Sequence, residues 1–325
     1  MKAYIVSNPG GAGVLELKEI EIPKAKKDWV LIKVKAFGLN RSELYTRQGH
    51  SGDAVPFPCV LGIECVGEVV EAPESDLEPG QKVACAMGQM GRKYNGSYAE
   101  YTLIPRSQVM SVETSLDWET FGALPESYFT AYGSVLEDMH VKPGDKVIVR
   151  GATSSVGMAA ISILKDIGAE IIATTRKVER KEILLNAGAN HIVIDTSEIA
   201  EKVKKIFPQG ADSILELVGT KNTLTDSFNC LKKKGIVCNT GLLGNEWGFK
   251  IPDLINEIKY TFYSTEKIET TTYTHILKKI IKKVEEGVYN PNIFKVFDFM
   301  DLVEAHKTME QNKAIGKMVI KIDHP

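Results

Sequence analysis

Residues 146–157 decide the fold, and they read KVIVRGATSSVG. The apolar, β-branched run over Lys146–Arg150 predicts a buried strand. Small residues follow as a turn, and Val156–Ile167 predicts a helix that Gly168 ends. A strand, a tight turn and a helix in this order predict the first unit of a parallel α/β sheet.

The same alternation continues downstream. The pattern predicts a helix over Val178–Asn186 and further short strands over Glu170–Thr175, His191–Ile194, Ser213–Val218, Ile236–Asn239 and Phe262–Ser264. These strands are apolar throughout, as expected when helices cover both faces of a parallel sheet.

The flanking regions have a different character. The first hundred residues favour a compact, barrel-like β domain, with strands over Val30–Ala36 and Gly62–Glu71. Near the other end, apolar positions over Ile276–Val284 repeat as one face of a helix. The lysines between them favour a solvated face over an anion site. A second helix over Asp301–Gln311 and a strand over Lys317–Ile322 follow.

Composition narrows the classes of protein. The 325 residues are 43% hydrophobic, which excludes disorder and suits about two domains. A net charge of -2 gives no basic footprint for nucleic acid. No apolar run approaches the roughly 20 residues of a membrane span, and Met1–Val6 reads as a strand instead of a secretion signal. Five scattered cysteines favour reduced thiols and a cytoplasmic protein.

The turn after the first strand has the pattern of a phosphate-binding loop. Gly151 and Gly157 occupy the outer places of a three-glycine fingerprint, and Ser154 occupies the middle one. Backbone N–H groups and the positive end of the helix would face a pyrophosphate, with hydroxyls from Ser154 and Ser155 and contacts from Val156 and Gly157. The alternative is a small-residue turn that merely packs the helix on the strand. The position of the turn in the first βαβ unit favours cofactor binding.

The end of the second strand selects the nucleotide. A preference for NAD typically needs Asp or Glu here, and this chain has Thr175, Arg176, Lys177 and Arg180. Cations in the first turn of a helix oppose its dipole unless an anion is bound. The 2′-phosphate of NADPH is such an anion. The alternative is an exposed basic turn without a ligand, and we favour NADPH.

Several motifs together indicate a family. The chain resembles the medium-chain dehydrogenase/reductase superfamily, and within it the zinc-free quinone oxidoreductase branch related to zeta-crystallin. The resemblance runs nearly end to end. It rests on residues 34–49 (VKAFGLNRSELYTRQG), 61–67 (LGIECVG), 96–101 (GSYAEY), 151–157, 216–219 (ELVG), 241–244 (GLLG) and 312–317 (NKAIGK).

The resemblance implies an α/β architecture with two domains. A GroES-like, β-rich catalytic domain would span residues 1–122 and be completed by 263–325. A Rossmann domain with a doubly wound parallel sheet would span 123–262. The resemblance also implies a cleft that holds NADPH, and commonly a homodimer.

Departures from the zinc-dependent members predict that no metal is bound. Those members have Cys where Leu39 and Asn40 stand, and His followed by Glu where Ile63 and Glu64 stand. Isoleucine has no lone pair for a metal, so a tetrahedral Cys/His site cannot form here. The region of residues 86–105 also lacks the four clustered cysteines of a structural zinc.

Without zinc, hydride transfer favours acceptors that conjugation already makes electron-poor, namely quinones and enones, whose oxygen neutral donors can stabilise. Asn40 is a candidate to hydrogen-bond the substrate oxygen or the nicotinamide ribose. By resemblance, Tyr45 lies near the nicotinamide, where it stacks on the quinone or donates to it, and Arg47 adds positive potential. The alternatives are an Asn that satisfies a turn, a core aromatic and a surface cation.

The resemblance adds further cofactor contacts. Thr130 would hydrogen-bond the nicotinamide, the alternative being a helical Thr satisfied by its own backbone. Gly241 and Leu242 would pass the nicotinamide ribose. Val218, Gly316 and Lys317 complete the predicted cofactor-binding set.

These residues predict an NADPH-dependent, zinc-independent reductase of quinones or activated enones. An alkenal or enoyl reductase would use the same chemistry on a narrower substrate. A reading of another class is a non-catalytic NADPH-binding sensor or structural protein. The partners expected are a small-molecule substrate and a second copy of the chain.

Overall fold

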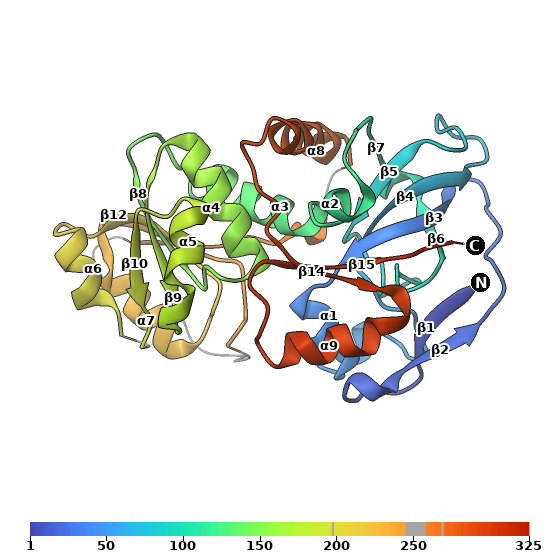
Figure 1. Ribbon diagram of the computed structural model, residues 1–325, viewed down its shortest axis with the longest axis horizontal. Helices are drawn as coiled ribbons and strands as arrows, with labels where there is room; N and C mark the ends of the chain where they lie inside the picture. The colour runs from blue at the N-terminus through green and yellow to red at the C-terminus, as the bar shows by residue number, and fades with distance from the viewer. Residues whose placement is uncertain (197, 245–257, 268–269, 325) are drawn as a thin grey trace. The chain divides into compact units, whose positions relative to one another are not determined.

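In the computed structural model, residues 1–325 are described except 197, 245–257, 268–269 and 325. The chain divides into two compact units. Unit 1 comprises Met1–Phe129, Thr265–Glu285 and Ile293–Pro325, and unit 2 comprises Thr130–Ser264 and Glu286–Asn292. Figure 1 traces the elements of both units.

Unit 2 contains a parallel sheet, six-stranded over its described residues, in the order β10-β9-β8-β11-β12-β13. Its strands are β8 (Lys146–Arg150), β9 (Glu170–Thr175), β10 (His191–Ile194), β11 (Ala211–Glu216), β12 (Leu231–Asn239) and β13 (Lys259–Phe262). Strand order reverses between β8 and β11, which is where doubly wound sheets place their ligand.

Helices accompany these strands as the alternation predicts. They are α4 (Ser155–Ile167), α5 (Lys181–Ala187), α6 (Ala200–Ile206) and α7 (Lys221–Asn229). Helix α4 contacts β8, β9 and α5, whereas α7 contacts β11, β12 and α6. A core that includes Ile148, Ile172 and Ile214 is fully buried beneath them. The expected doubly wound parallel sheet is therefore confirmed.

Unit 1 is the β-rich part of the chain. Its main sheet runs β14-β15-β3-β4-β5-β7, and β6 also pairs with β3. The strands, with the β1–β2 hairpin, are β1 (Lys2–Val6), β2 (Leu15–Glu19), β3 (Trp29–Gly38), β4 (Glu64–Glu71), β5 (Lys82–Ala86), β6 (Tyr101–Pro105), β7 (Met110–Ser111), β14 (Ile293–Asp298) and β15 (Lys317–Lys321). The C-terminal strands β14 and β15 thus complete a sheet that the N-terminal region begins.

Five helices belong to or begin in unit 1. They are α1 (Arg41–Arg47), α2 (Trp118–Gly122), α3 (Pro125–Tyr132), α8 (Thr270–Glu285) and α9 (Leu302–Glu310) among the described residues. Helix α8 buries Ile276, Leu277 and Ile280 and exposes Lys278 and Lys279, as its periodicity predicts. All five cysteines are buried and free, in agreement with the expected thiols.

Candidate active-site residues

The turn after β8 has a geometry that requires glycine at two positions. Gly151 adopts φ +86°, a left-handed conformation that residues with a Cβ rarely adopt. A Cβ at Gly157 would lie 2.6 Å from the carbonyl oxygen of Ala152, so α4 packs on the turn at a distance that only glycine allows. These constraints shape a loop for close backbone approach.

The Ser154 hydroxyl is used within the turn itself. The hydroxyl donates to the carbonyl of Gly151 at 2.9 Å. Its oxygen accepts from the N–H of Gly157 at 3.1 Å, so Ser154 is the N-cap of α4. The expected phosphate donors therefore reduce to the Ser155 hydroxyl and the first N–H groups of α4, at Ser155 and Val156, which have no intrahelical acceptor.

A basic turn ends β9 beside this loop. The Thr175 hydroxyl accepts from the N–H of Lys177 at 3.2 Å and fixes the turn. Arg176 and Lys177 are exposed, and Nη1 of Arg180 lies 3.4 Å from the hydroxyl of Thr153 in the phosphate turn. Burial, and then the positive charge of Arg176, lower the pKa of Arg180. The two guanidinium groups repel each other, and an anion bound between them would relieve this repulsion.

The loops after β11 and β12 meet the same turn. A Cβ on Gly151 would contact Val218 at 3.5 Å, so Val218 borders the phosphate loop. Gly241 packs so tightly that its Cβ would lie 2.4 Å from the carbonyl of Leu217. Val218, Gly241 and Leu242 are each partly exposed, and the N–H of Gly244 donates to Val218 at 2.7 Å. Apart from Thr130, the predicted residues of unit 2 thus gather at the carboxyl ends of adjacent strands.

Sequence reasoning missed an ion network beneath the loop. Arg150 is completely buried, and its Nε and Nη2 donate to Asp195 at 2.9 and 3.0 Å. Its Nη1 lies 3.0 Å from Asp226, and Glu216 lies 3.9 Å from Nε. Burial raises the pKa of Glu216 although Arg150 opposes the shift. The available signal was a charged residue at or just after the end of three apolar strands.

In unit 1, Asn40 lies in a buried polar cluster. Its Nδ2 donates to Glu64 Oε1 at 2.8 Å and to the carbonyl of Gly38 at 3.3 Å, and its Oδ1 accepts from Lys317 Nζ at 2.8 Å. Lys317 Nζ also donates to Glu64 Oε1 at 2.6 Å. The structure therefore joins Asn40 and Lys317, which the sequence assigned to different roles.

Arg47 is fully buried among groups of unit 1. Its guanidinium pairs with Glu310, donates to the carbonyl of Gly10 at 3.1 Å and meets His306 Nδ1 at 2.8 Å. This position corrects the surface-cation alternative. Burial, followed by Arg47, lowers the pKa of His306 to about 3. Arg47 therefore ties α1 to α9, and we leave it out of the substrate-binding set.

The remaining predicted residues have simpler surroundings. Tyr45 is half-buried, stands edge-on to His50 at 6.0 Å, and has a pKa that burial raises. Thr130 is buried in α3, and its carbonyl accepts from Ser134. Gly316 turns the chain with φ +87° just before β15.

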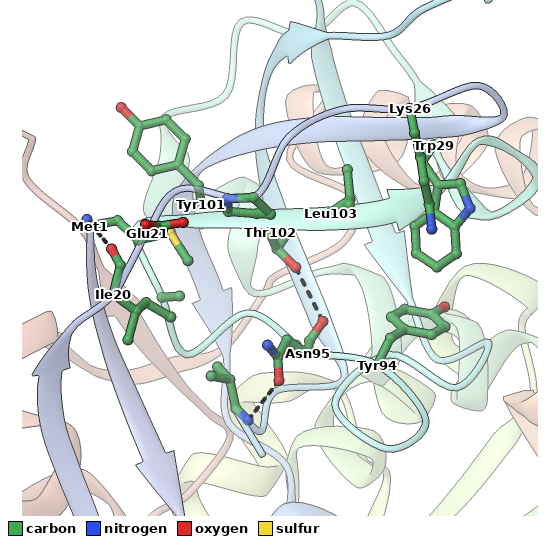
Figure 2. Close-up of a pocket in the computed structure, with 14 residues that line it drawn as sticks. Met1, Ile20, Glu21, Lys26, Trp29, Tyr94, Asn95, Tyr101, Thr102 and Leu103 are labelled. Atoms are coloured by element: carbon green, nitrogen blue, oxygen red, sulfur yellow. Dashed lines mark hydrogen bonds between the residues drawn. The ribbon is translucent and has the colours of Figure 1, made fainter. Parts of the chain in front are cut away.

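Unit 1 also has a cavity of about 280 Å³ that is separate from these residues. Figure 2 shows Trp29, Tyr94 and Tyr101 around it, with Lys26 over the Trp29 ring. None of the predicted site residues lines this cavity.

The doubly wound parallel sheet of unit 2 and the β-rich sheet of unit 1 together are the architecture of the dehydrogenase/reductase class of oxidoreductases. Residues 26–114 match the alcohol dehydrogenase GroES-like domain, and residues 155–278 match the zinc-binding dehydrogenase domain. The quinone oxidoreductase of Homo sapiens is 31% identical over 330 residues, covering 98% of this chain and 97% of the relative.

Solved structures share the fold. Quinone oxidoreductase of Escherichia coli complexed with NADPH superposes with a TM-score of 0.89 at 20% identity, covering 99% of this chain and 100% of that one. Mycobacterial Rv1454c complexed with NADPH gives 0.89 at 23% identity and the same coverage. The chain belongs to the medium-chain dehydrogenase/reductase superfamily, in its zeta-crystallin-like quinone oxidoreductase branch. It is an oxidoreductase.

The name of the second domain family raises the question of zinc, and the residues present do not fit that metal. Ile63 has no ligand atom, and the Glu64 carboxylate already binds the Lys317 ammonium at 2.6 Å. An ammonium at this distance would repel a second cation. Within the described ranges, no three His, Cys, Asp or Glu side chains converge as metal ligands. Over the same residues, no helix is long and apolar enough to cross a bilayer.

Proposed function

We propose that this oxidoreductase uses NADPH to reduce quinones or activated enones by direct hydride transfer without zinc. The observation that carries the proposal is the basic turn of Arg176 and Lys177 after β9, with Arg180 beside the phosphate loop. These cations suit a 2′-phosphate, and the glycine turn suits the pyrophosphate. Bound NADPH supplies the hydride.

The chain's own residues would position the reactants. In unit 2, the first N–H groups of α4 would bind the pyrophosphate, and Val218, Gly241 and Leu242 would line the ribose. Tyr45, half-buried in α1, would stack against a planar acceptor. With no metal to activate an alcohol, the acceptor has to be electron-poor through conjugation.

Substituting Arg176 and Lys177 together by Ala tests the cofactor assignment. Because each charge-assisted bond contributes on the order of 1.5–3 kcal/mol, we expect KM for NADPH to rise about tenfold to a hundredfold or more, with KM for NADH little changed. Lys204→Ala, an exposed cation of the same unit, is the matched control. Equal weakening of both cofactors would remove the 2′-phosphate assignment.

The acceptor class is tested by NADPH consumption with 1,4-benzoquinone, 9,10-phenanthrenequinone and an alkenal. Turnover of the alkenal alone would favour an alkenal or enoyl reductase. Tight NADPH binding without turnover of any acceptor would favour a sensor or structural protein. Zinc found in stoichiometric amount would contradict the metal-free mechanism.

We also propose a cytoplasmic homodimer. Strand β13 lies at one edge of the described sheet of unit 2, and Phe262 on it is 58% exposed. Such an edge offers backbone groups and apolar surface to a second copy. Sedimentation as a monomer at all concentrations would contradict the dimer, and the five free cysteines agree with a reducing compartment.

A further inference from the structure

The Glu216 carboxylate holds the backbone of the turn that follows β11. Glu216 is fully buried at the end of this strand, and its Oε1 accepts from the N–H groups of Val218 at 2.8 Å and Gly219 at 3.0 Å. Gly219 adopts φ +68°, and a Cβ on it would lie 2.5 Å from the carbonyl oxygen of Gly241. Because both N–H groups point to one buried oxygen, the chain itself sets the shape of this turn.

The same turn holds the loop that follows β12. The carbonyl of Leu217 accepts from the N–H of Leu243 at 3.1 Å, and the carbonyl of Val218 accepts from the N–H of Gly244 at 2.7 Å. Residues 241–242, which are predicted to border the ribose, lie just before these two donors. The buried carboxylate therefore positions both predicted ribose-binding segments of unit 2, the first directly and the second through the turn.

Arg150 and Ser227 hold the other oxygen of this carboxylate. Oε2 of Glu216 accepts from the Ser227 hydroxyl at 2.7 Å, and the Ser227 oxygen accepts from Arg150 Nη1 at 3.0 Å. Nε of Arg150 lies 3.9 Å from the same Oε2. A buried carboxylate needs such partners, because an unpaired charge in the interior is costly. The Glu216 side chain is thus held on both of its oxygens.

Asp226 provides a comparison within the same network. Its carboxylate lies 3.0 Å from Arg150 Nη1 and accepts from the N–H groups of Ile199 at 2.8 Å and Ala200 at 3.2 Å. Like Glu216, it joins Arg150 to two backbone N–H groups. The segment that it holds lies at the start of α6, and no residue predicted to bind the cofactor belongs to it.

We propose that Glu216 is a positioning residue for the nicotinamide cofactor, because it presets the backbone of residues 218–219 and, through them, the loop of residues 241–242. The inference rests on the proposed function. A turn that already has its bound shape loses less conformational entropy when a ligand binds. If removal of the carboxylate left about a tenth of the molecules with the turn in that shape, the apparent Kd would rise about tenfold. NADPH and NADH should weaken equally, because the nicotinamide ribose is common to both.

The test measures Kd for NADPH and for NADH by calorimetry. Glu216→Met removes both acceptor oxygens and keeps a side chain of similar length, so we expect both Kd values to rise about tenfold and by the same factor. Glu216→Gln removes the charge but keeps an oxygen that can accept from both N–H groups, so both Kd values should stay within about threefold of the wild type. The pair of variants separates the acceptor oxygen from the charge.

Asp226→Leu is the matched control. It removes a carboxylate that has the same kinds of partners, so it should lower the melting temperature as Glu216→Met does, but both Kd values should stay within about threefold of the wild type. Three results would overturn the positioning role: unchanged Kd values in Glu216→Met, equal weakening in Asp226→Leu, or equal weakening in Glu216→Gln. The last would assign the effect to the charge of Glu216 instead of its acceptor oxygen.

A variant of the turn tests the same idea with the carboxylate in place, and it decides the question if Glu216→Met does not fold. Gly219→Ala brings a methyl group to 2.5 Å from the Gly241 carbonyl oxygen, so the turn has to shift and both cofactors should weaken by one factor. Unchanged Kd values would contradict the proposal. The NADPH assignment fails separately, through equal weakening of NADPH and NADH in the Arg176 and Lys177 variant, and a wild-type protein that bound neither cofactor would contradict both.

Discussion

Arg150 in unit 2 and Lys317 in unit 1 are both buried cations, at 0% and 1% exposed, but their surroundings differ in kind. Arg150 uses the fork of its guanidinium on Asp195, and its Nη1 reaches Asp226 and the carbonyl of Thr223. Lys317 meets one carboxylate and one amide and keeps an N–H without a described acceptor. Arg150 therefore holds three neighbouring groups at once, whereas Lys317 makes two short hydrogen bonds.

Removing the Arg150 guanidinium should have the largest effect on stability. Arg150→Met leaves the carboxylates of Asp195, Glu216 and Asp226 together in the interior without a cation. Because an unpaired buried charge is costly, we expect the free energy of unfolding to fall by about 3–5 kcal/mol. Urea denaturation of the full-length protein measures this loss.

The double variant Lys317→Met with Glu64→Gln provides the contrast. It removes both charges of the ion pair, so it should lower the free energy of unfolding less than Arg150→Met does. If Arg150→Met changed the free energy of unfolding by less than the double variant, the two cations would not differ in the way described above.

A smaller effect should come from Glu43, which accepts from the N–H groups of Asn40 and Ile63 and from the Tyr98 hydroxyl. Burial raises its pKa from 4.5 to about 7. Between these pH values the folded protein holds more protons than the unfolded chain, so stability falls as pH rises through this window, by up to about 1.4 kcal/mol per pH unit.

Comparison of the wild type with Glu43→Gln isolates this contribution. From pH 5 to pH 7 the wild type should lose about 2 kcal/mol relative to the variant, as read from denaturation curves. The lowered pKa of His306 acts in the opposite direction, reducing stability as pH falls below 6.5, but it is common to both proteins. Parallel stability curves would show that Glu43 does not titrate in this range.

An exposed ion pair should contribute least to stability, and it serves as a reference for the two buried cations. Asp76 bonds Arg106 at 2.7 Å, and Arg106 holds the pKa of Asp76 at about 2, but the Asp76 side chain is 72% exposed. Solvent screens such a pair, so Asp76→Asn should lower the free energy of unfolding by less than about 1 kcal/mol. A larger loss in thermal denaturation would mean that burial does not explain the difference between these pairs.

The local part of the fold could be predicted from the sequence. Strands β8, β9 and β10 have the bounds expected from their apolar runs, and α4 begins one residue earlier than expected because Ser154 caps it. Strand β12 begins at Leu231, five residues before the expected Ile236, because Lys232–Lys234 are polar and Lys234 adopts φ 63°, which periodicity does not capture.

The partners of the candidate residues could not be predicted in the same way. Arg47 meets Glu310 and His306, and Lys317 meets Asn40, so each contact joins ends of the chain that only the folded sheet brings together. Sequence alone assigned Arg47 to a substrate or the surface, and Lys317 to the cofactor. The proximity of the residues from Gly151 to Gly157 was easier to predict, because they belong to one turn and are close in the sequence.

The bare α-carbon of Gly38 has a consequence for how such enzymes change over time. A Cβ at this position would lie 2.0 Å from Cε of Lys317, so a side chain here would move the end of the lysine away from its place beside Glu64. Replacement of this glycine would therefore also disturb the ion pair of Lys317 with Glu64, and we expect the residues at positions 38 and 317 to change together in evolution.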